Sequence, residues 1–209
     1  MQDLTELENL DIWGSNVSNQ GMMILKEFPK LRHLNLAWTS VTKLPALQSL
    51  KHLNMANCTI VSIFEDWEGL EGFLEELYLS GANISNPSEV FSGQWASNLL
   101  LIDFSSSYLK DFEFLDGKCK LEVLNLGGTI ADNVAMKTVA RIGFKLKQLD
   151  LSGCKVDSEG IGALARHLPK VEQIILSGTQ VDDSVFTFLQ VMTSLKSIDL
   201  SYTNVKGKR

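Results

Sequence analysis

The amino-acid sequence predicts an α/β solenoid, a curved horseshoe with a parallel β-sheet on its concave face. An eleven-residue phrase, L-x-x-L-x-L-x-x-[T/C/S/A]-x-[V/I/L], recurs nine times, and successive copies start 19 to 25 residues apart. Apolar and polar residues alternate within the phrase, which is typical of a short strand with one buried face. A period in this range indicates stacked repeats, each of which buries its apolar edge only against its neighbours.

The phrase covers nearly the whole chain, so we expect one domain of nine repeats over residues 1–209. Its copies begin at Leu7, Leu31, Leu50, Leu74, Leu99, Leu121, Leu146, Val171 and Leu195. Successive strands must run in the same direction, because the chain returns to the same side after each repeat. Nine strands spaced by about 4.8 Å predict a sheet roughly 40 Å long.

Each strand is followed by a leg that returns along the convex face, and three legs are predicted to be helical. Apolar residues at i, i+3, i+4 and i+7 indicate helices within 21–28, 158–168 and 182–192. In the first helix the expected apolar stripe includes Ile24. In the last helix the N-cap candidates are Asp182 and the aspartate that follows it.

Other legs are predicted to be 3₁₀ or irregular. Only 19 residues separate Leu31 from Leu50, which leaves room for a turn or a 3₁₀ segment. The leg after Ile84 contains Pro87 and is expected to be irregular. Tryptophans in the legs, Trp67 and Trp95, are expected to be packing residues.

Bulk composition bounds the classes of function. Apolar residues make up 44% and charged residues 21%, which favours a large folded core over disorder. The formal net charge of −6 argues against binding to nucleic acid or to an anionic membrane. No run of eighteen apolar residues occurs, so no membrane insertion is expected. The acidic N-terminal segment predicts no signal peptide.

The cysteines favour a reducing compartment. Cys58 and Cys154 stand at position nine of the phrase, where other copies have threonine, and are predicted to lie in the core without bridging. Cys119 stands in a polar loop without a partner. We therefore expect a cytoplasmic or nuclear protein, rather than an extracellular one stabilised by disulfides.

The phrase resembles that of the leucine-rich repeat family. Threonine or cysteine at position nine, and the tail CKVDSEGIGALA, are similar to the cysteine-containing and ribonuclease-inhibitor-like branches, although no copy has the asparagine that most members place there. The resemblance implies binding, as in receptors, adaptors and substrate-recognition arms of ubiquitin ligases. It implies neither catalysis nor a cofactor.

Position five of the phrase faces the concave side and carries a row of polar residues. Its carboxylates are Asp11, Asp103, Asp150 and Asp199, and no two of them are on adjacent strands. An enzyme would pair two carboxylates as acid and base, so this row is interpreted as a solvated polar face. No phosphate loop, nucleophile elbow or zinc motif occurs, and no catalytic residue is assigned.

His33 and His52 share position three on adjacent strands, which predicts Cβ atoms about 5 Å apart. We expect a polar recognition patch here, not a metal site, because the neighbouring Asn35 and Asn54 are poor transition-metal ligands and no Cys or Glu is expected in this row.

Large aromatic residues gather in the N-terminal half of the predicted face. Trp13 and Trp38 are expected to project from positions seven and eight of the first two strands and Tyr78 from position five of the fourth, whereas the sixth to eighth copies have Gly and Ser at positions seven and eight. Exposed Trp and Tyr favour a partner contact, although the Trp rings could instead cover the end of the core. The predicted partner-binding residues are Trp13, His33, Asn35, Trp38, His52, Asn54 and Tyr78.

The two ends of the array carry no evident caps. Leu4 precedes Leu7 by the same three-residue step by which Leu47 precedes Leu50, and the last strand is followed only by residues 204–209. We therefore expect a fragment or an array capped by another chain or by a second copy. The predicted function is a non-enzymatic protein-recognition scaffold. The alternatives are the substrate-receptor arm of a ubiquitin ligase and an architectural subunit.

Overall fold

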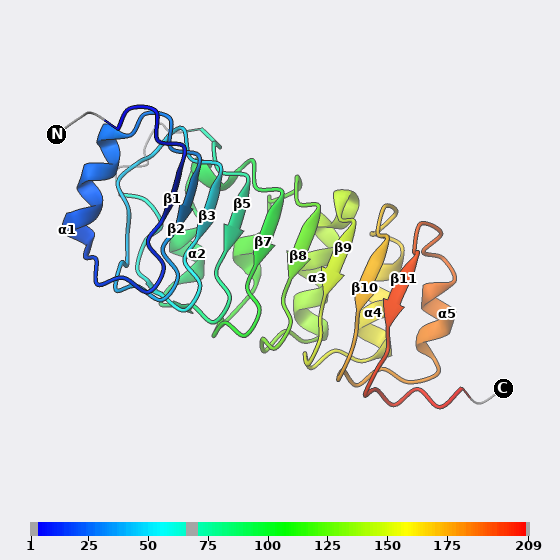
Figure 1. Ribbon diagram of the computed structural model, residues 1–209. Helices are drawn as coiled ribbons and strands as arrows, with labels where there is room; N and C mark the ends of the chain where they lie inside the picture. Colours follow the sequence, from blue (N-terminus) through cyan, green and yellow to red (C-terminus); the bar gives the residue numbers. More distant parts are fainter. Residues whose placement is uncertain (1–3, 66–70, 208–209) are drawn as a thin grey trace.

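A computed structural model describes residues 4–65 and 71–207. Among these residues the main sheet has nine strands, all parallel, in the order β1-β2-β3-β5-β7-β8-β9-β10-β11. Figure 1 shows the strands side by side, with β1 and β11 at opposite ends and the helices along one face of the sheet. The strands are β1 (Asn9–Asp11), β2 (His33–Asn35), β3 (His52–Asn54), β5 (Glu76–Tyr78), β7 (Leu101–Asp103), β8 (Val123–Asn125), β9 (Gln148–Asp150), β10 (Gln173–Ile175) and β11 (Ser197–Asp199).

Every strand consists of positions three to five of the phrase, as the alternation predicted. The pairing keeps equivalent positions opposite each other, so that His33 pairs with His52 and Asn35 with Asn54. Position four is the buried residue of the strand, as at Leu53 and Leu77, which are 0% exposed. Positions three and five therefore point away from the core on every strand.

The legs hold shorter elements on the opposite face. Helices are α1 (Asn19–Met22), α2 (Pro87–Val90), α3 (Asn133–Ile142), α4 (Ser158–Ala165) and α5 (Val185–Leu189). The 3₁₀ segments are η1 (Met23–Glu27), η2 (Gln94–Ala96), η3 (Glu113–Leu115) and η4 (Gly143–Lys145), and β4 (Thr59–Ile60) pairs with β6 (Asn83–Ile84).

The helical prediction within 158–168 is confirmed for 158–165, because α4 buries Ile161, Leu164 and Ala165 of the expected apolar stripe. Leu168, the last residue of that stripe, is also buried but lies three residues beyond the end of the helix. The prediction within 21–28 is partly wrong. Met22, the last residue of α1, is buried, and the chain then tightens into η1, where Leu25 is buried and Ile24 is 54% exposed. A 3₁₀ segment has three residues per turn, so residues three apart share its inner face and Ile24 points outward.

The prediction for 182–192 needs a correction at its start. The helix α5 begins at Val185, its N-cap residue is Ser184, and no side chain caps it. Asp182 instead accepts hydrogen bonds from the backbone N–H and the hydroxyl of Ser184 at 3.0 and 2.5 Å. Asp183 accepts from the N–H groups of Lys206 and Gly207 at 2.7 and 3.0 Å. Asp182 therefore closes the turn before α5, and Asp183 holds the segment that follows β11.

The longest helix, α3, was not among the sequence predictions. Its N-cap Asp132 accepts from the backbone N–H groups of Val134 and Ala135 at 2.9 and 3.1 Å. Met136 and Val139 on its inner face are 0% exposed. The signal was present in the sequence, because an aspartate precedes an apolar stripe of helical spacing.

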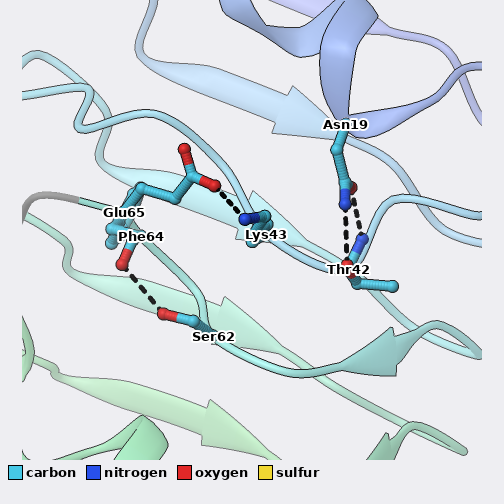
Figure 2. A network of polar contacts seen from close by, with 6 residues as sticks. All are labelled: Asn19, Thr42, Lys43, Ser62, Phe64 and Glu65. Atoms are coloured by element: carbon cyan, nitrogen blue, oxygen red, sulfur yellow. Dashed lines mark hydrogen bonds and ion pairs between the residues drawn. The ribbon is translucent and has the colours of Figure 1, made fainter.

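The short second leg is held by polar contacts instead of a helix, as its length predicted. Asn19 and Thr42 bond reciprocally, with the Asn19 amide donating to the Thr42 hydroxyl at 2.9 Å and the Thr42 N–H donating to Asn19 Oδ1 at 2.8 Å (Figure 2). Lys43 forms an ion pair with Glu65 in the next leg (Figure 2). The leg after Ile84 was predicted to be irregular. It contains only two short helical segments, α2 and η2.

The core runs the length of the array and includes the residues predicted for it. Cys58 and Cys154 are each 2% exposed, and their thiols donate to the carbonyls of Leu36 and Leu126 at 3.3 and 3.0 Å. Trp95 is 1% exposed and packs against aromatic rings that include Phe64 and Phe91, as expected of a packing residue. Trp67 lies outside the described residues.

Candidate functional site

Most strands of the main sheet end in a turn that is closed by the side chain at position five of the phrase. In seven of the nine strands this residue is Asp or Asn, and its Oδ1 accepts the backbone N–H two residues later at 2.8 to 3.2 Å. The two exceptions are Tyr78 and Ile175. The row of carboxylates and amides therefore has a structural role, since it satisfies the first N–H of each turn.

Position eight of the phrase has a left-handed backbone in all nine turns. Five turns have glycine there, with φ between +64° and +70°. The other four have Trp38, Asn57, Ser106 and Tyr202, with φ between +56° and +61°. A left-handed backbone is strained in residues with a Cβ atom, and a bulky side chain is rare there.

On the concave face, four side chains of β2, β3 and β5 form a connected group. The rings of His33 and His52 stack with centroids 4.2 Å apart and planes inclined by 4°. His52 Nδ1 lies 2.9 Å from Glu76 Oε2, and the Tyr78 hydroxyl donates to the same oxygen at 2.9 Å. The predicted proximity of the two histidines is confirmed.

The prediction that no glutamate shares this row is wrong, because Glu76 is the position-three residue of β5 and pairs with His52 in the sheet. Glu76 was identifiable from the sequence, because it stands at position three of the copy that begins at Leu74. This carboxylate orients the imidazole of His52 and the phenol of Tyr78. Among the described residues no group of three or more His, Cys, Asp and Glu is placed to hold a metal ion.

The hydrogen bond between Glu76 Oε2 and the Tyr78 hydroxyl also shifts the pKa values of these two side chains. Burial acts to raise the pKa of Glu76, but hydrogen bonds from His52 and Tyr78, together with charge interactions with His52 and His33, outweigh it and hold this pKa below its ordinary value. For Tyr78, burial acts together with the hydrogen bond to Glu76 and the charges of Glu76 and Asp103, raising the pKa to about 12. The carboxylate is therefore ionised and the phenol neutral at physiological pH.

A hollow of about 370 Å³ lies over β1, β2, β3 and β5. Of the seven predicted partner-binding residues, it brings together five: His33, Asn35, His52, Asn54 and Tyr78. Asn35 and Asn54 also close their turns, so their carbonyl oxygens are already engaged with backbone N–H groups. Asp11 also lines the hollow, and its Oδ2 accepts from the Asn35 amide at 3.1 Å.

The other two predicted residues, Trp13 and Trp38, do not line the hollow. They lie in the turns that follow β1 and β2, beyond the strand face, and each is 61% exposed. The two turns are neighbours, because the N–H of Gly14 donates to the carbonyl of Ala37 at 2.8 Å. Both indoles are therefore exposed at the carboxyl edge of the strands that carry the hollow.

Comparisons with known proteins agree on the architecture. A family model described as "Leucine Rich repeat" matches residues 144–165. The solved structure of internalin C2 from Listeria monocytogenes is similar, with a TM-score of 0.72 and 19% identity, over 95% of this chain and 82% of that chain. The fold is that of the leucine-rich repeat proteins.

Other leucine-rich repeat structures are similar over almost the whole chain. A chain of the mouse RP105/MD-1 complex has a TM-score of 0.74 and 20% identity, over 96% of this chain and 35% of that chain. A leucine-rich repeat protein of Leptospira interrogans has a TM-score of 0.65 and 16% identity, over 96% of this chain and 62% of that chain. Identities this low establish the fold alone. A search of curated proteins finds no significant match.

Within residues 4–65 and 71–207, no helix is long and apolar enough to cross a bilayer. The resemblance to the cysteine-containing and ribonuclease-inhibitor-like branches stays a prediction.

Proposed function

We propose that the chain is a non-enzymatic protein-recognition scaffold whose partner binds the N-terminal half of the concave sheet. The observation that carries the proposal is the hollow over β1, β2, β3 and β5, with two exposed tryptophans at the carboxyl edge of β1 and β2. Aromatic residues beside polar groups give large contact area at low entropic cost, and they are enriched at the centres of interfaces.

The backbone at Trp38 supports a role in binding. Its φ of +61° places a bulky residue where five other turns have glycine. The side chain is 61% exposed, so core packing does not account for it. Strain kept at an exposed position is a recurrent property of binding sites.

The carboxylates of position five support a non-enzymatic function. Asp103 and Asp150 lie on β7 and β9, which are separated by β8, and each accepts a backbone N–H of its own turn at 2.8 Å. Such groups are engaged in the scaffold and are not paired as general acid and base.

A substrate-receptor arm of a ubiquitin ligase and an architectural subunit are the alternatives, and both would also bind protein. The free thiols of Cys58, Cys119 and Cys154 favour a reducing, intracellular setting for each of them. A capping contact with another chain is also proposed. It is supported by apolar residues of the first and last repeats, such as Leu10 and Ile198, which are only partly buried.

The test compares three forms of the chain as immobilised bait: wild type, Trp38→Ala and Tyr202→Ala. Tyr202 is the matched control, since it is also an exposed aromatic residue at position eight but lies at the other end of the array. Proteins retained by wild type and Tyr202→Ala, but lost by Trp38→Ala, are identified by mass spectrometry. Their affinities are then measured by calorimetry.

Loss of an interface tryptophan typically costs about 2 kcal/mol of binding free energy. Trp38→Ala should therefore weaken binding by more than about tenfold. Equal loss in both variants, or unchanged affinity in Trp38→Ala, would show that the partner does not bind here. Co-purification of a ligase assembly, or of one fixed complex, would select one of the two alternatives.

A further inference from the structure

The negative charge of the chain is concentrated on the concave face. Positions three, five and seven carry five carboxylates among the described strands and turns, and no lysine or arginine occurs at any of these positions. The carboxylates are Asp11, Glu76, Asp103, Asp150 and Asp199. The whole chain has a formal charge of −6, so this face accounts for most of the excess.

The edge of the sheet formed by position two of the phrase, beside the concave face, is electrically balanced. At position two, lysines and glutamates on neighbouring strands form ion pairs across the sheet. Their nitrogen–oxygen distances are 2.9 Å for Lys51–Glu75, 2.6 Å for Lys147–Glu122 and 2.8 Å for Lys196–Glu172. Charge at this edge therefore cancels locally, and the unbalanced potential belongs to the concave face.

The C-terminal carboxylates of the face keep one oxygen available. Asp103, Asp150 and Asp199 each use Oδ1 to accept the N–H of their turn at 2.8 Å. Within the described part of the chain, Oδ2 of Asp103 and Asp150 accepts no hydrogen bond, and the carboxylate of Asp199 accepts one further hydrogen bond, from the side chain of Ser201. Each can therefore pair with a cation without giving up its turn.

These three aspartates recur on every second strand. They lie on β7, β9 and β11, and the intervening strands have Asn125 and Ile175 at the same position. With about 4.8 Å between strands, successive carboxylates are roughly 9.6 Å apart. A segment in the extended polyproline II conformation advances about 3.1 Å per residue with three residues per turn, so side chains three residues apart lie on the same side and are spaced by roughly 9 Å.

We infer that the concave face binds an extended basic segment of the partner protein, with arginine or lysine at every third residue. This inference rests on the proposed scaffold function and names the chemistry of its partner. The segment lies across the strands, with its cations on Asp103, Asp150 and Asp199. Towards β1 it reaches the hollow, where Asp11 favours a guanidinium. The exposed indole of Trp38, beside the hollow at the carboxyl edge of the strands, can stack on a further cation.

Other cationic or polyanionic ligands fit this face less well. A single metal ion cannot be shared by carboxylates on alternate strands, because its ligands must lie within about 2 to 2.6 Å of it. Nucleic acid would be repelled by a face with five carboxylates and no lysine or arginine at the positions described.

The probe is a fluorescent peptide of repeated Arg-Ser-Pro triplets, titrated into the full chain and followed by anisotropy. The test variant carries Asp103→Asn, Asp150→Asn and Asp199→Asn together. Asparagine closes the same turn at Asn35, Asn54 and Asn125, so the variant keeps the fold and loses only charge.

The matched control carries Glu27→Gln, Glu113→Gln and Glu159→Gln, which are exposed residues of the legs and change the net charge equally. Three weakened ion pairs should reduce affinity by about tenfold in the test variant and by less than about twofold in the control. Amide shifts in NMR spectra should fall on β7 to β11. A peptide with the same arginines clustered at one end should bind more weakly than the spaced peptide.

Equal losses in the test and control variants would overturn the inference, since they would indicate attraction by net charge alone. So would shifts on the legs, or equal binding of the spaced and clustered peptides. The proposed scaffold function is separable from this result. If a natural partner is lost by Trp38→Ala but retained by the three-aspartate variant in high salt, the scaffold stands and the basic segment is wrong.

Discussion

Trp38 and Tyr202 occupy the same position of their turns and share a left-handed backbone, with φ of +61° and +56°. Both side chains are exposed, at 61% and 92%. Glycine takes this position in five other turns, including Gly128 and Gly153. Two aromatic residues are thus held at opposite ends of the array where glycine would be less strained.

The first prediction is that Trp38→Gly stabilises the protein. A left-handed backbone costs a residue with a Cβ atom about 1 to 2 kcal/mol, and the greater freedom of glycine in the unfolded chain offsets part of the gain. We expect a rise of about 0.5 to 1 kcal/mol in the free energy of unfolding, measured by urea denaturation. Tyr202→Gly should give a similar rise. A loss of stability at Trp38 alone would show that its indole contributes packing.

The second prediction concerns the phenol of Tyr78. Its pKa of about 12 lies above the ordinary value of 10.0, so the folded state holds this proton more tightly than the unfolded state. The resulting stabilisation is present below pH 10 and is lost as pH rises from 10 to about 12. The phenolate absorbance of Tyr78 should therefore appear late in an alkaline titration, while circular dichroism confirms that the chain remains folded.

In Glu76→Gln, the phenol of Tyr78 should ionise at a lower pH, because the charge of the carboxylate is removed. Tyr78→Phe identifies which absorbance step belongs to this residue. An unchanged titration in Glu76→Gln would mean that the hydrogen bond between the two side chains is not made in solution.

The third prediction concerns acid. The pKa of Glu76 in the folded state lies below its ordinary value of 4.5, so its contacts with His52 and Tyr78 stabilise the fold above pH 4.5. That contribution is lost as pH falls through the lowered pKa. Wild type should lose more stability than Glu76→Gln between neutral pH and pH below 4.5, as measured by thermal melts. Parallel curves for the two proteins would contradict this.

The fourth prediction tests the cap of α3. Asp132→Ala removes the acceptor of two backbone N–H groups, at Val134 and Ala135, and should cost about 1 kcal/mol of unfolding free energy. Asp132→Asn keeps an oxygen at the same place and should cost much less. Chemical denaturation of the two variants distinguishes the cap from a simple effect of charge, which both substitutions remove.

The fifth prediction concerns thiol reactivity. Cys119 is exposed, whereas Cys58 and Cys154 are buried. Burial also raises the pKa of Cys154, which lowers its fraction of reactive thiolate. Cys119 should react rapidly with a thiol reagent in the native protein, and the other two should react only after denaturant is added. Rapid native reaction in Cys119→Ser would show that the repeats open readily.

The strands were predictable from sequence because one phrase sets both their period and their buried face. Leu53 and Leu77 repeat the same environment, so a single rule places every strand of the main sheet, although not β4 and β6 in the legs. The legs were less predictable because each has its own length and its own local contacts. Ile24 fits a helical stripe in sequence, but the tightening of α1 into η1 turns it to solvent.

The candidate site was partly predictable for the same reason. Sheet register placed His33 beside His52, yet it gave no sign that their rings would stack or that Glu76 would join them. Trp38 was expected on the strand face, but the left-handed turn carries it beyond that face. Backbone conformation after a strand depends on turn hydrogen bonds, which hydrophobic periodicity does not report.

The closure of seven turns by either aspartate or asparagine has a consequence for how such a protein can change. Asp103 and Asn125 make the same bond to the backbone, at 2.8 and 2.9 Å, but differ by one unit of charge. A single nucleotide change can exchange these residues, because their codons differ only at the first base. The electrostatic pattern of the concave face is therefore free to diverge strand by strand under selection for new partners, while the scaffold beneath it is inherited intact.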